Sequence, residues 1–439
     1  MTSNAFSDLG LNNQLVKVTE ELFFKEPTEI QTKIIPEVLK ENSVIGESQT
    51  GSGKTHAFLL PLLNQIEEDK NEVQYVIAVP TRELAMQIHA DIEEIIKLAN
   101  KKDVWTSRLL VGGLDRDRMK KQLKNAPDII IGTPGRILDM VKDNAVSIYS
   151  AKSFVIDEAD LMLDMGFLDE IDQLLVRCRT DIQTLVFSAT IPEKLKHFFD
   201  KYLAQPTHIE VKSSITPLSI EHKLIELRHR NPVELIEQIS QTIQPFVAII
   251  FANNKDKANQ LFKELKNVGL NVGILHGGLS ARERKRLVND VRDLKFEYIV
   301  ATDLASRGID IPGVSHIINV ELPNEVDFYI HRVGRTARAG NEGMAISFFN
   351  DEDLSLIDSL EKRGVNFTYS DITSNGFVER KPANKRKKRK NTTTDLDRLA
   401  WQQVKRPKKV KPGYKKKMKN QQEAIKRSLV QQKNKRRKK

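Results

Sequence analysis

Short apolar runs alternate with longer stretches of helical periodicity from about residue 40 to residue 350. The runs are continuously apolar and often β-branched, which is typical of strands buried on both faces of a parallel sheet. Most intervals between them can hold a crossover helix, so the pattern predicts an α/β fold made of βαβ units. The expected strands are Ser43–Ile45, Tyr75–Val79, Ile129–Ile131, Phe154–Ile156, Leu185–Phe187, Val247–Phe251, Val272–Leu275, Tyr298–Ala301, Ile317–Val320 and Ala345–Phe349.

The chain has 439 residues, which is too long for one compact core, since domains usually hold ~100–200 residues. Pro206, Pro217 and a polar stretch around residues 204–219 predict a linker, which we place at 210–219, between a first domain at 36–209 and a second at 220–370. Residues 1–35 are expected to lead into the first domain. Past about residue 370 the apolar pattern fades into lysine, asparagine and glutamine, so we predict a disordered tail at 371–439.

Charge divides the chain into two parts of opposite sign. Residues 380–439 hold 26 Lys or Arg and three acidic residues, a net charge of +23. The remaining 379 residues hold 44 basic and 56 acidic residues, a net charge of −12. A basic arm on an acidic body is typical of a segment that binds a polyanion, and Trp401 and Tyr414 within it could stack on unpaired bases. The alternatives are a solvated tail that aids solubility and a nuclear import signal.

The composition excludes several classes of protein. No stretch approaches the ~18 consecutive apolar residues that a membrane span requires. The first ten residues lack the basic start and apolar block of a secretory signal. Cys178 is the only cysteine, which excludes a disulfide framework or a metal centre built from cysteines. We therefore expect a cytoplasmic protein with no membrane partner.

A glycine-rich segment follows the first expected strand and precedes a helical run. Glycines let the backbone curl so that its N–H groups face a phosphate at the N-terminus of a helix. Lys54 is expected to reach the β- and γ-phosphates of a nucleotide, and the Thr55 hydroxyl to help hold Mg²⁺. The residues of this phosphate loop are Ser48, Gln49, Thr50, Gly51, Ser52, Gly53, Lys54 and Thr55.

Acidic residues follow the apolar run Phe154–Ile156, where the second half of a nucleotide site is expected. Asp157 is predicted to contact Mg²⁺, and Glu158 to orient or deprotonate the attacking water. An isolated acidic cluster would normally be a solvated loop, but this one follows a buried strand and accompanies a phosphate loop. Together the two segments predict an NTPase.

Residues 157–160 read Asp-Glu-Ala-Asp, and from about residue 6 to 365 the sequence resembles the DEAD-box ATP-dependent RNA helicases. Other motifs of that family occur in the family's order, which makes the resemblance specific. They are Phe24, Pro27, Thr28, Ile30 and Gln31 of the adenine-sensing Q motif, then Pro80–Ala85, Gly112 with Gly113, Thr133–Arg136, Ser188–Thr190, Ala301–Asp310 and His331–Arg338.

The resemblance implies two tandem RecA-like domains that bind ATP and Mg²⁺ on the first domain and RNA across both. It implies that Asp160, Ser188 and Thr190 couple hydrolysis to strand separation. Hydroxyls and arginines on loops after strands can also bind phosphates without reading bases. The RNA contacts implied are Pro80, Thr81, Arg82, Gly112, Gly113, Thr133, Pro134, Arg136 and Thr302.

Further residues are expected at the nucleotide. The Gln31 amide can pair with an adenine edge, and Phe24 could stack on the base. Arg335 and Arg338 are three residues apart, so on a helix they would share a face and could act as arginine fingers on the γ-phosphate. A surface helix bearing salt bridges is the alternative. By resemblance, Asp310 would touch the ribose and His331 would link ATP to the RNA-bound state.

Four positions depart from the family pattern. Phe23 and Ala337 stand where glycine is usual, Ser48 replaces a common alanine, and Ala281 stands where glutamine is frequent. We expect a changed local backbone at Phe23 and the loss of a side-chain amide at Ala281.

These observations predict an RNA-dependent ATPase and helicase that unwinds short duplexes without sequence preference. Resemblance to bacterial members suggests RNA remodelling, ribosome assembly or RNA decay in the stress response to cold, with ribosomal or decay assemblies as partners of a monomeric core. A DNA-directed translocase with the same core and a non-catalytic RNA chaperone are the alternatives. A GTPase is disfavoured because residues 254–257 do not form an Asn-Lys-x-Asp motif.

Overall fold

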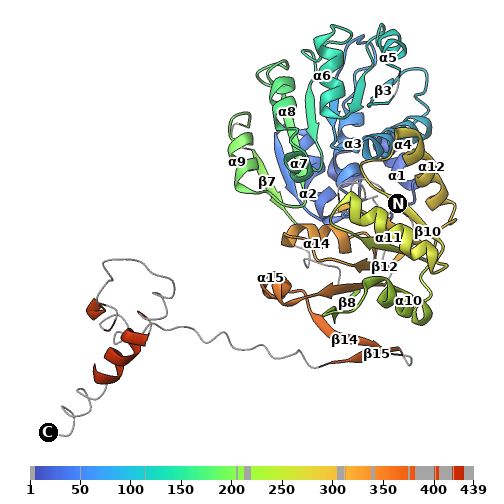
Figure 1. The fold of residues 1–439 in the computed structure, drawn as a ribbon. Helices are drawn as coiled ribbons and strands as arrows, with labels where there is room; N and C mark the ends of the chain where they lie inside the picture. Colours follow the sequence, from blue (N-terminus) through green and yellow to red (C-terminus); the bar gives the residue numbers. More distant parts are fainter. Residues whose placement is uncertain are drawn as a thin grey trace. The chain divides into compact units, whose positions relative to one another are not determined.

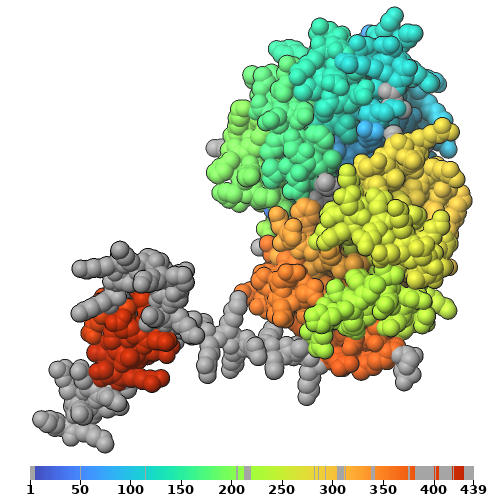
Figure 2. Space-filling view, viewed as in Figure 1, coloured from blue at the N-terminus to red at the C-terminus, as the bar shows by residue number. Residues whose placement is uncertain are grey.

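The computed structural model describes residues 5–49, 51–113, 115–203, 206–211, 219–303, 311, 313–337, 342–373, 376–380, 400, 402–404, 418 and 420–429. The chain forms two compact units, residues 1–379 and residues 380–439. The larger unit holds two separate sheets (Figure 1). In Figure 2 the residues around the first sheet run from blue to green and those around the second from yellow-green to orange.

The first sheet is parallel throughout, in the order β3-β4-β2-β5-β6-β1-β7. The strand that precedes the phosphate loop, β1, therefore lies next to β6 and one strand away from β5, the strand that precedes Asp157. The strands are β1 (Val44–Glu47), β2 (Tyr75–Ala78), β3 (Ser107–Leu110), β4 (Ile129–Gly132), β5 (Ser153–Ile156), β6 (Gln183–Ser188) and β7 (Thr207–Glu210).

Helices cover both faces of this sheet (Figure 1). Alternate strand residues enter two different apolar clusters, Ile77 on one face and Val76 on the other. This confirms strands buried on both faces. The helices are η1 (Ser7–Leu9), α1 (Asn13–Glu21), α2 (Glu29–Leu39), α3 (Lys54–Asn64), α4 (Arg82–Leu98), α5 (Arg116–Gln122), α6 (Pro134–Lys142), α7 (Ala159–Asp164), α8 (Leu168–Leu175) and α9 (Glu193–Phe199).

The second sheet has the order β10-β11-β9-β12-β13-β8-β14-β15 and is parallel except for the pair β14–β15. Its strands are β8 (Ile220–Glu226), β9 (Val247–Phe251), β10 (Val272–Leu275), β11 (Tyr298–Ala301), β12 (Val314–Asn319), β13 (Gly343–Phe349), β14 (Phe367–Thr373) and β15 (Gly376–Glu379). Its helices are α10 (Pro232–Thr242), α11 (Lys255–Asn267), α12 (Ala281–Arg292), α14 (Val326–Val333), η3 (Asp351–Asp353) and α15 (Leu354–Lys362).

Each expected strand is present, and the fold is the predicted pair of RecA-like domains. The strands that the sequence did not indicate, such as β3 and β8, carry polar residues. In β8, His222 is buried, and its Nδ1 lies 2.9 Å from the hydroxyl of Tyr329. Polar side chains can be buried in such a strand because hydrogen bonds satisfy them. The strand therefore shows no continuous apolar run in the sequence.

The second domain extends further than expected. The prediction that structure ends near residue 370 is wrong, because β14 and β15 form an antiparallel pair on the edge of the second sheet. Ile372 is buried within that domain's core, whereas the alternating polar residues of β14 concealed the strand in the sequence. In the unit formed by 380–439, residues 420–429 are helical, which the lysine-rich composition did not indicate.

None of the helices that the structure describes is long and apolar enough to cross a membrane.

Phe23 lies two residues after the end of helix α1, in a backbone conformation that glycine usually adopts. Its φ is 59°, its N–H donates to the carbonyl of Glu20, and the N–H of Phe24 donates to the carbonyl of Thr19. This pair of bonds is a Schellman motif, which requires a left-handed residue at the position of Phe23. The backbone therefore keeps the glycine-like conformation, and the side chain is 89% exposed.

We expect Phe23→Gly to raise the free energy of unfolding by about 0.5–1 kcal/mol, because glycine removes the left-handed strain but loses more chain entropy on folding. Urea denaturation would measure the change. Gly269→Ala is the matched control, since Gly269 follows α11 in the same motif with φ 88° and open space around its missing Cβ. It should destabilise the protein by about 1 kcal/mol. A loss of stability in Phe23→Gly would mean that the phenylalanine ring contributes a contact that offsets its strain.

Candidate nucleotide and RNA site

The phosphate loop connects β1 to the N-terminus of α3. Gly51 and Gly53 have φ angles of 83° and 98°. A Cβ on Gly53 would lie 2.7 Å from Nε2 of Gln31 and 2.9 Å from Oγ1 of Thr28, so only glycine fits there. Lys54 is buried, and its ammonium donates to the carbonyl of Ser48 within the loop. The predicted loop therefore has the curled backbone and the inward-facing lysine that phosphate binding requires.

The Q-motif residues pack directly against this loop. The Gln31 amide oxygen accepts from the N–H of Thr28 at 2.9 Å, and its nitrogen donates to the carbonyl of Gly53 at 3.2 Å. One amide hydrogen and one lone pair remain for a base, because the amide offers two of each. The Phe24 ring makes an edge contact with His56 at 4.8 Å, and burial lowers the pKa of His56 to about 4.

Asp157 follows β5 and is almost completely buried. Its Oδ1 accepts the N–H of Glu158 at 2.9 Å. Burial raises the pKa of Asp157 to about 7, although the charge of Lys54 opposes the rise. A buried carboxylate of this kind is stabilised by a nearby cation, because the cation offsets the lost hydration of the charge.

Glu158 lies at the N-terminal cap of α7 with φ 50° and ψ 53°, the left-handed region. A non-glycine residue in this region costs free energy, and such strain is found most often at functional sites. The position fits the catalytic role predicted for this side chain.

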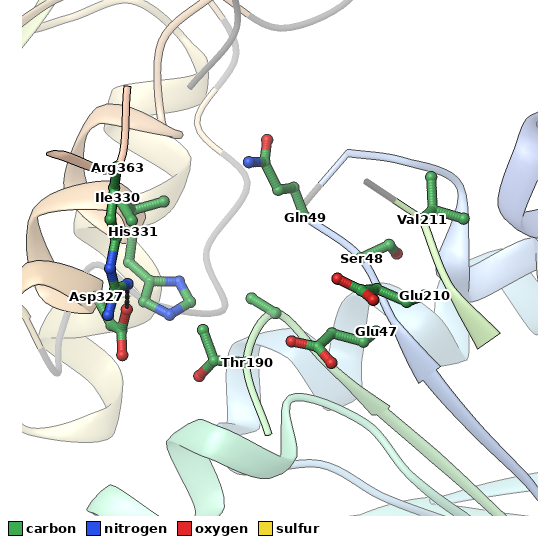
Figure 3. Close-up of a pocket in the computed structure, with 11 residues that line it drawn as sticks. Glu47, Ser48, Gln49, Thr190, Glu210, Val211, Asp327, Ile330, His331 and Arg363 are labelled. Atoms are coloured by element: carbon green, nitrogen blue, oxygen red, sulfur yellow. Dashed lines mark hydrogen bonds and ion pairs between the residues drawn. The ribbon is translucent and has the colours of Figure 1, made fainter. Parts of the chain in front are cut away.

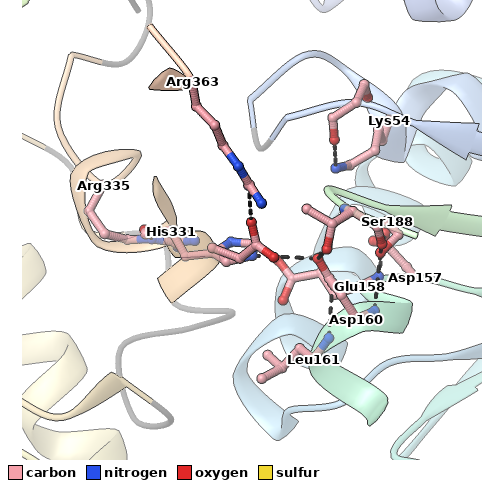
Figure 4. A network of polar contacts seen from close by, with 12 residues as sticks. Lys54, Asp157, Glu158, Asp160, Leu161, Ser188, His331, Arg335 and Arg363 are labelled. Carbon is pink, nitrogen blue, oxygen red and sulfur yellow. Dashed lines mark hydrogen bonds and ion pairs between the residues drawn. The ribbon is translucent and has the colours of Figure 1, made fainter. Parts of the chain in front are cut away.

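Asp160 is the centre of a polar network that joins the two domains (Figure 4). Its Oδ2 lies 3.3 Å from the N–H of Thr190 and 3.4 Å from Nε2 of His331, on α14 of the second domain. Its own N–H donates to Oγ of Ser188 at 3.1 Å, and that hydroxyl donates to the carbonyl of Thr190. Burial raises the pKa of Asp160, but the hydrogen bond and charge of His331 together with the charge of Lys54 hold it well below its usual range. The structure thus brings together all the residues predicted to couple hydrolysis to strand separation.

A cavity of about 370 Å³ lies beside the phosphate loop (Figure 3). In Figure 3, the side chain of His331 faces Thr190 across the space. The predicted phosphate-loop residues Ser48 and Gln49 line the same cavity. The cavity is lined by Glu47, Ser48, Gln49, Ala189, Thr190, Glu210 and Val211 of the first domain and by Asp327, Ile330, His331 and Arg363 of the second.

The arginines of the sixth motif have separate environments. Arg332 is 2% exposed, and its guanidinium binds the carboxylate of Asp303 with distances of 2.5 and 2.7 Å. It also donates to Asn253 at 2.7 Å and to the carbonyl of Glu321 at 2.7 Å. Arg332 therefore fixes the residue that follows Thr302, one of the predicted RNA contacts. No site role was predicted for this arginine, because nothing in the motif shows which of its cations points into the core.

The prediction that Arg335 and Arg338 share a helix face is wrong. Helix α14 ends at Val333, and Ala337 adopts a left-handed φ of 55°, so Arg335 lies in a turn after the helix. Arg335 is buried beside His331, and its Nε donates to the carbonyl of that residue at 3.3 Å. Of the other predicted site residues, Thr50, Asp310 and Arg338 lie outside the described residues.

The predicted RNA contacts of the first domain lie at the carboxyl ends of neighbouring strands. Thr81 and Thr133 cap the N-termini of α4 and α6, which follow β2 and β4. Gly112 follows β3, and a Cβ there would lie 2.9 Å from Nη2 of Arg82, so the arginine packs on the glycine. The order β3-β4-β2 therefore places these three loops in one row along the sheet edge.

A second link between the domains was not predicted. Nε of Arg284, on α12, lies 2.6 Å from Oε1 of Glu83, on α4. Both side chains are mostly buried, with 17% and 12% exposed. Glu83 lies within the motif Pro80–Ala85, but the sequence held no signal that it meets Arg284, because 200 residues separate them.

The residues present fit a magnesium ion bound with a nucleotide. Among the described residues no group of three or more His, Cys, Asp or Glu could hold a metal alone. Mg²⁺ needs no such group, because it is usually held by one or two carboxylates, water and substrate phosphates. The buried carboxylate of Asp157 and the hydroxyl of Thr55 at the start of α3 are suitable ligands.

The two parallel sheets, the phosphate loop and the carboxylates after β5 define a P-loop ATPase with two RecA-like domains. Residues 28–198 match the DEAD/DEAH box helicase family, and residues 231–340 match the helicase conserved C-terminal domain. The chain is 47% identical over 440 residues to the DEAD-box ATP-dependent RNA helicase CshB of Bacillus subtilis (strain 168), covering 100% of both chains. The chain belongs to the DEAD-box ATP-dependent RNA helicases, and it is an RNA-dependent ATPase.

Other known proteins agree with this assignment. CshB of Listeria monocytogenes serovar 1/2a is 43% identical over 426 residues, which is 96% of this chain and 97% of that protein. The structure of S. cerevisiae Dbp5 bound to RNA and ADP BeF3 is similar, with a TM-score of 0.75 and 30% identity over 84% of this chain and 95% of Dbp5. Mss116p bound to ssRNA and AMP-PNP is similar, with a TM-score of 0.73 and 28% identity over 84% of this chain and 79% of Mss116p.

We expect Arg332→Met to lower the free energy of unfolding by about 3–5 kcal/mol, because it leaves the carboxylate of Asp303 buried without its cation. Denaturation with urea would measure the loss. Arg363→Met is the matched control, since Arg363 pairs with Asp327 at 2.6 Å but is 47% exposed. That variant should lose no more than about 1 kcal/mol. Equal losses in the two variants would contradict the structural role given to Arg332.

Proposed function

We propose that this helicase unwinds short RNA duplexes by closing its two domains around ATP and RNA, and that hydrolysis reopens them to release the strand. The observation that carries the proposal is the contact between Asp160, beside the nucleotide carboxylates, and His331 of the second domain. Ser188 and Thr190 share this network through hydrogen bonds to Asp160, so it adjoins both the nucleotide carboxylates and the domain junction.

In the proposed reaction, the backbone N–H groups of 48–55 and the ammonium of Lys54 bind the phosphates. Asp157 and Thr55 would hold Mg²⁺, which when bound would supply positive charge to the phosphates. Glu158 orients the attacking water and accepts its proton. Arg335 and Arg338 supply cations to the γ-phosphate from the second domain, Asp310 contacts the ribose, and Phe24 with Gln31 selects adenine.

RNA is proposed to lie across both domains with contacts to its backbone and few to its bases. The loops after β2, β3 and β4 and residue Thr302 offer backbone N–H groups, hydroxyls and arginines, which bind phosphate and ribose without reading sequence. The ion pair between Glu83 and Arg284 joins the first of these loops to the second domain. It would stabilise the arrangement in which both domains hold one strand.

The cellular role proposed is RNA remodelling in the cytoplasm, in ribosome assembly or RNA decay during the stress response to cold. It rests on similarity to relatives named CshB across the whole length of the chain. The basic tail would then add sequence-independent affinity for structured RNA in ribosomal or decay assemblies, and the core would act as a monomer.

We expect the ATPase rate to rise with RNA and not with DNA of the same sequence. Glu158→Gln should lower the RNA-stimulated rate by roughly 10²–10⁴-fold, because it removes the proton acceptor and leaves the fold intact. The measurement is phosphate release with single-stranded RNA, with DNA and without nucleic acid. Equal stimulation by RNA and DNA would favour a general translocase. Tight RNA binding without hydrolysis would favour an RNA chaperone.

Deletion of residues 380–439 should weaken RNA binding and reduce its dependence on salt, because each phosphate neutralised by a lysine or arginine releases counterions. Binding would be measured by fluorescence anisotropy over a series of salt concentrations. The basal ATPase rate should stay unchanged, since the deleted residues form a separate unit. An unchanged salt slope would contradict a role of the tail in RNA binding.

A further inference from the structure

Helix α5 carries a concentration of positive charge on a body that is acidic overall. Residues 115–124 contain five basic residues and two acidic ones, whereas residues 1–379 have a net charge of −12. One of the two acidic side chains, Asp115, caps the helix by accepting the N–H of Arg118 at 2.8 Å. These ten residues include none of the predicted nucleotide or RNA contacts.

The basic residues form two rows, because residues three or four apart share a helix face. Arg116 and Lys120 make one row and both bind the carboxylate of Asp143, at 2.6 and 2.9 Å. Arg118 and Lys121 make the other row, Lys124 lies two residues beyond the end of the helix, and all three are exposed. Among the described residues no carboxylate pairs with this second row. We name Arg118, Lys121 and Lys124 the α5 basic row.

The sheet topology places this row at the end of the RNA-contact loops. The loops after β2, β4 and β3 follow one another along the carboxyl edge of the sheet, and β3 is the edge strand. Helix α5 begins three residues after Gly113, in the connection that leaves β3. The pairing of Arg116 and Lys120 with Asp143 holds α5 beside the end of α6, whose first residues form another of the loops. A strand that passes the three loops and continues beyond the sheet edge therefore meets α5.

We propose that the α5 basic row binds the phosphates of RNA that continues past Gly112 and Gly113, outside the segment held by the motif loops. The proposal rests on the RNA-binding function proposed above and extends the RNA surface of the first domain. It gives the enzyme a preference for long RNA over short single strands, through contacts that do not read sequence.

A protein partner fits this surface less well. Protein interfaces centre on buried aromatic or aliphatic anchors, and charged residues are depleted at their cores. Of the large hydrophobic side chains exposed in the described structure, none lies on α5, and its methionine, Met119, is buried. Three exposed cations, with which no carboxylate pairs in the part of the chain that the structure describes, suit a flexible polyanion.

The test compares two RNAs in the full-length protein. One is a single strand of about ten nucleotides, near the site size of a single-strand-binding domain, and the other carries about twenty further nucleotides on each side. The variant Arg118→Gln/Lys121→Gln/Lys124→Gln should bind the short RNA as the wild type does. For the long RNA, the slope of log affinity against log salt concentration should fall in magnitude by roughly 2, since each lost phosphate contact on a single strand removes ~0.7.

The matched control neutralises three exposed lysines elsewhere on helices, as Lys97→Gln/Lys263→Gln/Lys266→Gln. Its slope for the long RNA should equal that of the wild type. The proposal is overturned if the two variants lose affinity equally, or if the α5 variant binds short and long RNA with equally reduced affinity. Stimulation of the ATPase by the short RNA shows that each variant is folded. If the short RNA does not stimulate the wild-type ATPase, the result counts against the proposed function and not against the role of the α5 basic row. If the triple variant does not fold, the pair Lys121→Gln/Lys124→Gln takes its place, with an expected fall of roughly 1.4.

Discussion

The rest of the site depends on the contacts that the buried carboxylate of Asp160 makes with both domains. It is 7% exposed, and burial of this kind is unfavourable for a charge unless partners compensate. The partners are the N–H groups of Leu161 and Thr190 and the imidazole of His331. Because one of them comes from the other domain, the charge of Asp160 is best stabilised when the domains are together. The same requirement ties the residues beside the nucleotide to the domain that carries the sixth motif.

Buried charge also organises the second domain. The guanidinium of Arg332 donates hydrogen bonds to residues that follow or end three different strands, namely Asn253, Asp303, Asn319 and the carbonyl of Glu321. A planar guanidinium can hold several acceptors in fixed directions, which a lysine cannot do. The motif that would supply arginine fingers therefore also contains the residue that orders the loops around it. Within this motif Arg332 has a structural role, and Arg335 lies in the turn after α14.

Backbone conformation explains where the chain departs from its family. Phe23 and Ala337 replace glycines, and both keep the left-handed φ that glycine would adopt, 59° and 55°. Glu158 has the same conformation within the Asp-Glu-Ala-Asp segment. At Phe23 and Glu158 the turn is set by a hydrogen bond of the helix that it ends or begins, so a side chain is strained before the turn is lost. The family pattern thus records a backbone requirement that this sequence meets without glycine.

The sequence by itself determined the two α/β domains, the phosphate loop, the carboxylates and the order of the motifs, because these depend on local periodicity and on residue types at short spacing. Strands β8 and β14 could not be read, since polar residues interrupt their apolar pattern, and the buried His222 of β8 is satisfied by the distant Tyr329. The tertiary structure alone decided that Glu83 meets Arg284, that His331 reaches Asp160, that Arg332 is internal, and that α5 follows the last loop of the row. Each of these depends on the order of strands in a sheet or on contact between domains, and no spacing along the chain encodes either.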